Sequence, residues 1–206
     1  MGVTIHYHGR ISDKRLLPKL IEELAEISKV HGWEYRIFEP EFPLDSDSSS
    51  DTKQSGLLYG IWLVPPGSDP VSITFLRNGR MCGPLQLQNW GGSTDETERR
   101  YLYMNFTKTQ YAGVEIHKMI IGVFRYIAER YLSDFRLSDE GEYWETGDEE
   151  LLKENFRRTE AMIDGFAGAL RENTRGEGES MDAYLERIIR EFREKNDSAN
   201  KTDESR

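Results

Sequence analysis

The sequence predicts an α+β fold, a curved and mainly antiparallel sheet with helices on one face, followed by a C-terminal helical hairpin. Strand-like segments come as one group between two helical segments, whereas a parallel α/β fold would alternate them. Asn78-Gly79, a strong hairpin signal, lies inside that group. After Thr146 the apolar residues recur every three or four positions, and no further strand pattern follows. The expected order is therefore strand, helix, several strands, helix and then the hairpin.

The first strand and the first helix are predicted within residues 3–32. Residues 3–11 alternate between apolar and polar side chains, as in a strand with one buried face. Apolar residues then recur at helical spacing over residues 17–31, with Ser12 as the expected N-cap and Gly32 as the expected end. Pro18 is tolerated only in the first turn, so this helix should begin near Leu16.

The grouped strands follow a Ser/Asp-rich segment, residues 43–56, that we expect to be a mobile loop. The nearly all-apolar segment 57–66 is predicted to be a central strand, and Pro84 marks the second hairpin arm as an edge or a bulge. A polar loop is expected over residues 89–100. The predicted strands are 33–40, 57–66, 71–77, 80–87 and 101–109.

The most apolar helix is predicted over residues 111–132, with a short last strand within 133–144. We therefore place an α+β domain at residues 1–145, a helical hairpin appendage at 146–195, and a tail without stable structure at 196–206.

The hairpin has a narrow apolar seam, with Ser180 as the expected N-cap of its second helix. Two glycines in one turn, Gly165 and Gly168, suggest that another element approaches closely. A narrow seam leaves some apolar side chains partly uncovered, among them Met162, Tyr184 and Ile189. We therefore predict that the chain forms a homodimer through its C-terminal helices.

Residues 139–152 hold many carboxylates and no basic side chain before Lys153. Thr146 and Glu149 have the spacing of a capping box, in which each side chain satisfies a backbone N–H of the other. Acidic residues in the first helical turn are also favoured by the helix dipole. Four carboxylates remain outside this explanation, namely Asp139, Glu140, Glu142 and Glu145. They form either a solvated turn around Gly141 or part of a functional site.

A metal site is one hypothesis for these carboxylates. His6 and His8 are one strand step apart and point to the same face, which suits two ligands of one zinc or iron ion. Glu140 and Glu142 could supply further ligands. The alternative is two exposed or half-buried imidazoles beside a solvated acidic turn, and we favour it.

A pocket or partner surface is the other hypothesis. His117 is either a core histidine bonded to a carboxylate or a pocket residue, with Lys108 and Gln110 at the pocket mouth. Trp90 and Trp144 lie in or beside predicted loops, where exposed aromatic side chains tend to contact partners.

Composition narrows the function further. The net charge of −10 over 206 residues disfavours nucleic acid and anionic membranes unless the basic residues cluster, and we expect neither partner. Cys82 is the only cysteine, which fits a reducing cytoplasmic location. There is no apolar stretch of membrane-spanning length and no signal-peptide pattern.

No nucleophile elbow, phosphate loop or dinucleotide motif occurs, so we expect no cofactor. The main hypothesis is a non-catalytic interaction or regulatory module whose protein partner is basic. The alternatives are a small-molecule-binding α+β module and, with less support, a small metal-dependent hydrolase or lyase.

Overall fold

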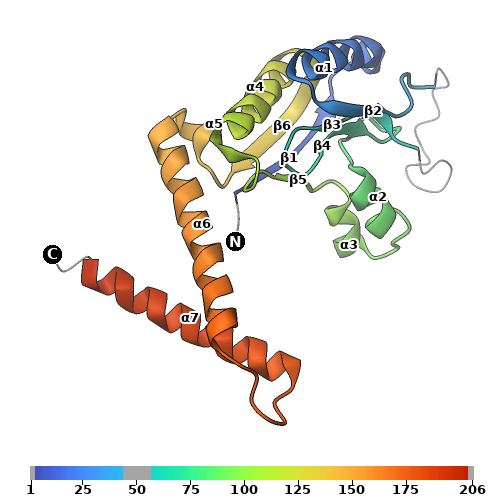
Figure 1. Cartoon of the computed structure of the whole chain (residues 1–206). Helices are drawn as coiled ribbons and strands as arrows, with labels where there is room; N and C mark the ends of the chain where they lie inside the picture. Colours follow the sequence, from blue (N-terminus) through green and yellow to red (C-terminus); the bar gives the residue numbers. More distant parts are fainter. Residues whose placement is uncertain (1–2, 44–56, 204–206) are drawn as a thin grey trace. The chain divides into compact units, whose positions relative to one another are not determined.

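The computed structural model describes residues 3–43 and 57–203, with side chains up to residue 192 (Figure 1). The described residues fall into two compact units that divide between Phe156 and Arg157. The predicted loop at 43–56 lies almost entirely outside the described residues. The α+β class is confirmed, because the first unit combines two three-stranded antiparallel sheets with helices.

The first sheet has β1 (Thr4–Ile11) at its centre, between β5 (Asn105–Lys108) and β6 (Leu132–Asp139). Both neighbours run antiparallel to β1. The alternation of residues 3–11 is confirmed, since Ile5 and Tyr7 are buried while His6 and His8 are exposed. The last strand, predicted only as a short one, is β6.

The second sheet has the order β2 (Glu34–Ile37), β3 (Tyr59–Val64) and β4 (Val71–Phe75). The apolar segment predicted to be central is β3, and β2 is an edge strand. The connection at residues 79–82 links the two sheets by main-chain hydrogen bonds to both. Met81 N donates to Gly9 O of β1 at 2.9 Å, and Cys82 N donates to Thr74 O of β4 at 3.0 Å.

Two long helices complete the main core, α1 (Leu17–His31) and α4 (Gly113–Tyr131). Helix α1 lies against β2 and β3, and α4 lies against β6 (Figure 1). Gly32 ends α1 in the left-handed region, as predicted. The predicted Ser12 cap is wrong. Asp13 caps the short 3-10 turn η1 (Lys14–Leu16) before α1, and Ser12 Oγ donates to Tyr131 O instead.

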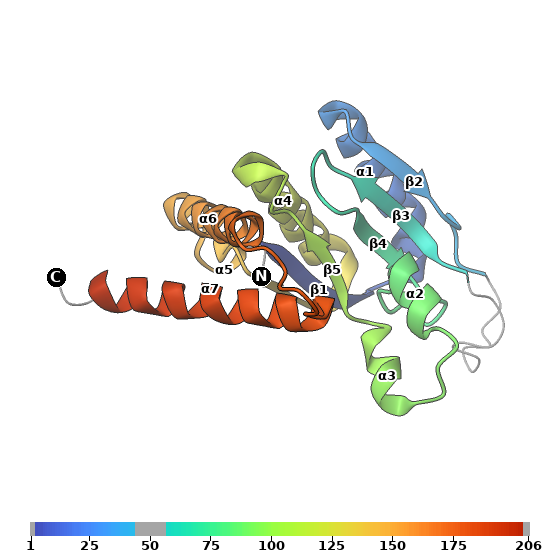
Figure 2. The same ribbon diagram turned by 60° about the horizontal axis from the view of Figure 1, so that its bottom comes forward.

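The predicted second hairpin arm is a helix rather than a strand. Helix α2 (Pro84–Trp90) follows a single bridge between Phe75 and Met81, and α3 (Glu96–Tyr101) occupies the expected polar loop. Proline is favoured at the first position of a helix, where its missing N–H costs nothing. Figure 2 shows α2 and α3 lying together next to the start of β5. Beneath them is a second small core of Leu58, Leu76, Cys82 and Leu102.

The predicted capping box at Thr146 is also wrong. A short helix, α5 (Tyr143–Thr146), ends at this residue, and α6 (Glu149–Glu172) begins after it. Asp148 Oδ1 accepts hydrogen bonds from the backbone N–H groups of Glu150 and Leu151, so Asp148 is the cap. Thr146 Oγ1 accepts from Asp148 N and donates to Glu142 O.

The boundary between the units falls after Phe156 instead of at Thr146, because the first turns of α6 belong to the first unit. Leu152 is fully buried there. The second unit contains the rest of α6 and helix α7 (Met181–Asp203). Helix α7 continues through residues 196–203, where the sequence predicted a tail without stable structure.

Within the second unit, α6 and α7 meet through aromatic and small side chains. Ser180 Oγ accepts from Ala183 N at 3.2 Å, which confirms the predicted cap. The rings of Phe166 and Phe192 meet edge to face at 5.8 Å. A side chain at Gly165 would lie 3.0 Å from the Phe192 ring, so the close approach is confirmed there, whereas the corresponding position at Gly168 is open.

Candidate functional site

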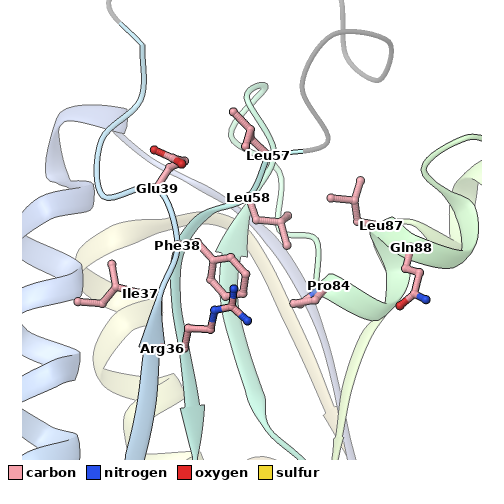
Figure 3. A pocket seen from close by; sticks show the side chains of 9 residues that line it. All are labelled: Arg36, Ile37, Phe38, Glu39, Leu57, Leu58, Pro84, Leu87 and Gln88. Carbon is pink, nitrogen blue, oxygen red and sulfur yellow. The ribbon is translucent and has the colours of Figure 1, made fainter.

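A groove of about 610 Å³ lies between the edge strand β2 and helix α2 (Figure 3). Phe38, Leu58 and Leu87 belong to the small core beneath α2, so they form a preformed apolar floor. The lining residues are Arg36, Ile37, Phe38, Glu39, Leu57, Leu58, Pro84, Leu87 and Gln88. The groove is concave and mainly apolar, with a few polar groups, as ligand sites commonly are.

Hydrogen bonds fix the α2 wall of the groove. Gln86 is buried and donates from Nε2 to Met104 O at 3.1 Å, which ties α2 to the segment leading into β5. A Cβ atom at Gly83 would lie 2.5 Å from Gln86 Oε1, so a side chain at Gly83 would displace the amide of Gln86. Leu87 N donates to Gly83 O at 3.0 Å and closes the first turn.

Arg36 and Phe38 extend from β2 toward the groove, whereas Ile37 points to the opposite side of the strand (Figure 3). The guanidinium of Arg36 lies 5.1 Å from the centre of the Phe38 ring, a cation–π contact. Glu39 and Leu57 stand at the rim. The groove therefore offers an apolar floor, one cation and one carboxylate.

The outer edge of β2 adds a second kind of binding capacity. All four residues of β2 are exposed, and no strand in the described part of the chain pairs with this edge. Tyr35 and Ile37 are 37% and 43% exposed, which is high for large side chains on a strand. An edge strand presents unpaired backbone donors and acceptors, to which an extended chain can add.

Sequence reasoning missed this groove because its α2 wall was predicted to be a strand. Leu85 and Leu87 alternate with polar residues, which is the strand pattern. The signal that favours a helix is Gly83-Pro84, since proline often opens a helix.

His117, a predicted pocket residue, is fully buried in a polar cluster with Thr109 and Asp139. Its Nε2 lies 3.0 Å from Asp139 Oδ2, and its Nδ1 lies 2.8 Å from Thr109 Oγ1. A carboxylate only accepts hydrogen bonds, so Nε2 carries a proton. The alternative prediction of a core histidine bonded to a carboxylate is the one found. Burial of all three groups leaves a substrate no access to them, and the cluster is structural.

Asp139 is the centre of this cluster. Its carboxylate accepts hydrogen bonds from the backbone N–H groups of Gly141, Tyr143 and Trp144, in addition to His117. Burial raises the pKa of Asp139, but these hydrogen bonds and the charge of His117 outweigh it and hold the pKa below its usual value. The cluster fixes the end of β6 to α4 and α5.

The candidate metal ligands are only partly brought together. His6 Nε2 lies 3.7 Å from Glu140 Oε1, and Glu140 Oε2 also accepts from Thr4 N. His8 lies opposite Arg136 on β6. Glu142 is exposed, in a left-handed turn. Among residues 3–43 and 57–203, no three His, Cys, Asp or Glu side chains gather closely enough to hold a metal ion.

The other candidate surface residues lie apart from one another. Lys108 is exposed and Gln110 half-buried near the end of β5, on either side of the buried Thr109. Trp144 packs against Phe135 at 6.1 Å. Of the candidates, Trp90 lies nearest the groove, since it packs on the small core that forms the floor.

Cys82 is buried in the same small core, and burial raises the pKa of its thiol to about 12. The thiolate needed for nucleophilic chemistry is therefore scarce at neutral pH.

None of the helices in the described part of the chain combines the length and apolar character that crossing a bilayer requires. Comparison of the chain with models of known protein families, with curated proteins and with solved structures gave no match.

Proposed function

We propose that this protein is a non-catalytic interaction module that binds an extended segment of a partner protein along the outer edge of β2, beside the groove. The supporting observation is an open sheet edge next to a preformed apolar groove, both of which include residues of β2. A segment added to β2 would form main-chain hydrogen bonds along the edge, and its side chains would alternate between the two faces.

The groove favours a particular pattern in the partner segment. Phe38, which follows β2, and Leu58 and Leu87 beyond it form an apolar surface for partner side chains that point to the groove side of the sheet. Arg36 favours a carboxylate next to this surface, and Glu39 at the rim favours a basic residue. The net charge of −10 favours association with a basic protein through long-range attraction.

The test is selection of peptides from a random displayed library of about twelve residues on the intact protein. Three variants carry one new aspartate each at an exposed apolar residue. Leu57→Asp changes the groove rim, Ile37→Asp changes the strand edge, and Val30→Asp changes α1 away from the groove. We expect selected peptides to lose at least about tenfold in affinity, or about 1.4 kcal/mol, on the first two variants and to keep it on the third.

If the selected peptides pair with β2 as an added strand, their binding also requires free backbone N–H groups. Methylation of alternate backbone nitrogens removes the donors that pair with β2, so it should abolish binding in one of the two alternations and not in the other. Failure to enrich any peptide, or equal binding to Leu57→Asp and the unchanged protein, would reject the proposal. Binding insensitive to both methylation patterns would instead favour the alternative of a site that takes compact small molecules.

A further inference from the structure

The solvent side of the first sheet carries several basic side chains that are far apart in the sequence. Arg10, Lys108 and Arg136 come from β1, β5 and β6, and Arg80 pairs with Arg10 in a bridge at the end of β1. His6 and Phe106 face each other between the strands. These six residues are called the basic face below. It is distinct from the groove.

This face is opposite the side of the sheet on which α4 packs. Tyr7 and Phe135, on the opposite side of the sheet, pack on Phe124 of α4 with ring centres 4.5 and 5.9 Å away. Because side chains alternate along a strand, their neighbours His6 and Arg136 point to the other side, where both are exposed.

The charges on the basic face are not neutralised by neighbours. Within the described residues, none of the four cations Arg10, Arg80, Lys108 and Arg136 forms an ion pair with a carboxylate. Arg80 lies over the Tyr103 ring at 3.3 Å, and Arg10 donates to Asn78 O. Carboxylates near the face include Asp69, whose backbone N–H donates to Lys108 O, and also Asp134 and Glu140. Glu140 is already engaged with Thr4 N and lies near His6.

Planar side chains lie at the centre of the face. Phe106 is 38% exposed, and its ring centre lies 6.4 Å from that of His6. His8 is the next outward residue on β1 and is also exposed. Exposed rings on a sheet, flanked by cations, are the arrangement on which single-stranded nucleic acids stack their bases.

We infer that the basic face binds single-stranded nucleic acid, with bases stacked on Phe106 and His6 and phosphates near Lys108, Arg136 and Arg10. Composition argues against nucleic acid only while the basic residues stay dispersed, and antiparallel pairing of β1 with β5 and β6 brings them together. An acidic polypeptide would satisfy the cations but would leave the exposed rings without a planar partner. Nucleic acid satisfies both.

The test is fluorescence anisotropy of a labelled twelve-nucleotide oligouridylate with the intact protein at low salt, beside a poly-glutamate peptide of equal charge. With about three phosphate contacts, the logarithm of the binding constant should fall with the logarithm of the salt concentration with a slope of about −2. Lys108→Gln and Arg136→Gln should each reduce that slope by about 0.7. Phe106→Leu should weaken binding about tenfold and leave the slope unchanged.

Lys29→Gln, which removes a cation from α1, is the matched control and should leave binding unchanged. Three outcomes would each overturn the inference. They are no oligonucleotide binding below about millimolar concentration, equal binding of the poly-glutamate peptide, and full affinity in Phe106→Leu. Lys108, Arg136 and Phe106 are exposed, so their substitution should leave the fold intact. Circular dichroism of each variant checks that the fold is kept.

Discussion

At the scale of single residues, Asp139 is a buried carboxylate of the first unit that is surrounded by hydrogen-bond donors. A carboxylate buried without partners would be very costly, and here four donors surround it. Gly141 belongs to the same arrangement, because a Cβ atom there would lie 2.6 Å from Leu152 Cδ1 and 3.1 Å from His117 Nε2. The cluster therefore specifies packing of the turn after β6.

Replacement of this carboxylate tests its structural role. Asp139→Asn should lower the free energy of unfolding by about 3 kcal/mol, because the amide cannot accept the same set of charged hydrogen bonds. Glu140→Gln, next to it and half exposed, should stay within about 0.5 kcal/mol. Urea denaturation at neutral pH measures both. Similar small effects in the two variants would show that the cluster contributes little.

The Asp139 carboxylate should make the free energy of unfolding depend on pH in the acidic range. Its pKa in the folded state lies below its usual value, so its contribution is fully present above the unfolded pKa of about 4 and is lost as the pH falls through the folded pKa. The free energy of unfolding should therefore fall below pH 4. The fall should be shallower in Asp139→Asn than in the unchanged protein. Parallel pH profiles in the two proteins would contradict this assignment.

At the scale of elements, the start of α6 shows how a neighbouring residue can take over a cap. Asp148→Ala should lower the free energy of unfolding by about 1 kcal/mol, since two backbone N–H groups of the first turn lose their acceptor. Thr146→Ala should cost less, about 0.5 kcal/mol, because Thr146 Oγ1 accepts from only one backbone N–H group, that of Asp148. Thermal or chemical denaturation ranks the two. The reverse order would restore the capping box predicted from sequence.

Two glycines, one in a strand and one in a helix, allow a comparison of how much each position tolerates a Cβ atom. Gly60 in β3 has a φ of 129°, and a Cβ atom there would lie 2.3 Å from Ile73 O, a backbone atom of β4 that cannot move aside. Gly60→Ala should therefore destabilise the protein by more than about 2 kcal/mol. Gly122 in α4 is exposed with open space around it, so Gly122→Ala should stabilise by about 0.5–1 kcal/mol. Equal effects at both sites would contradict the geometry of β3.

At the scale of the whole molecule, self-association through the second unit stays a prediction. Ile189 on α7 is 38% exposed, Met162 is half-buried, and Tyr184 is tied by its hydroxyl to Leu170 O and Asn173 O. Sedimentation at micromolar concentration should detect a dimer that Ile189→Glu weakens. The groove variant Leu57→Asp should leave the dimer intact. A strict monomer at these concentrations would reject the prediction.

The sequence alone determined the class of fold and most of its elements. The spacing of apolar residues and the residues that begin or end a helix are local properties of the sequence. They predicted the strand at residues 3–11, the helix that ends at Gly32 and the cap at Ser180 without any knowledge of tertiary contacts. The acidic composition and the lack of catalytic motifs led to the hypothesis of an interaction module with a basic protein partner, which stays a prediction.

Tertiary structure decided which elements pack against one another and therefore which residues form each candidate site. Residues 84–90 alternate like a strand, but they form helix α2, whose Gln86 donates to Met104 O and whose Pro84, Leu87 and Gln88 line the groove. His117 and Asp139 lie on separate elements, and only the packing of α4 against β6 makes them partners. Arg10, Lys108 and Arg136 are distant in sequence, and strand pairing alone brings them onto one face. Hydrogen-bond partners and charge clusters depend on distances between elements, which no local pattern of side chains encodes.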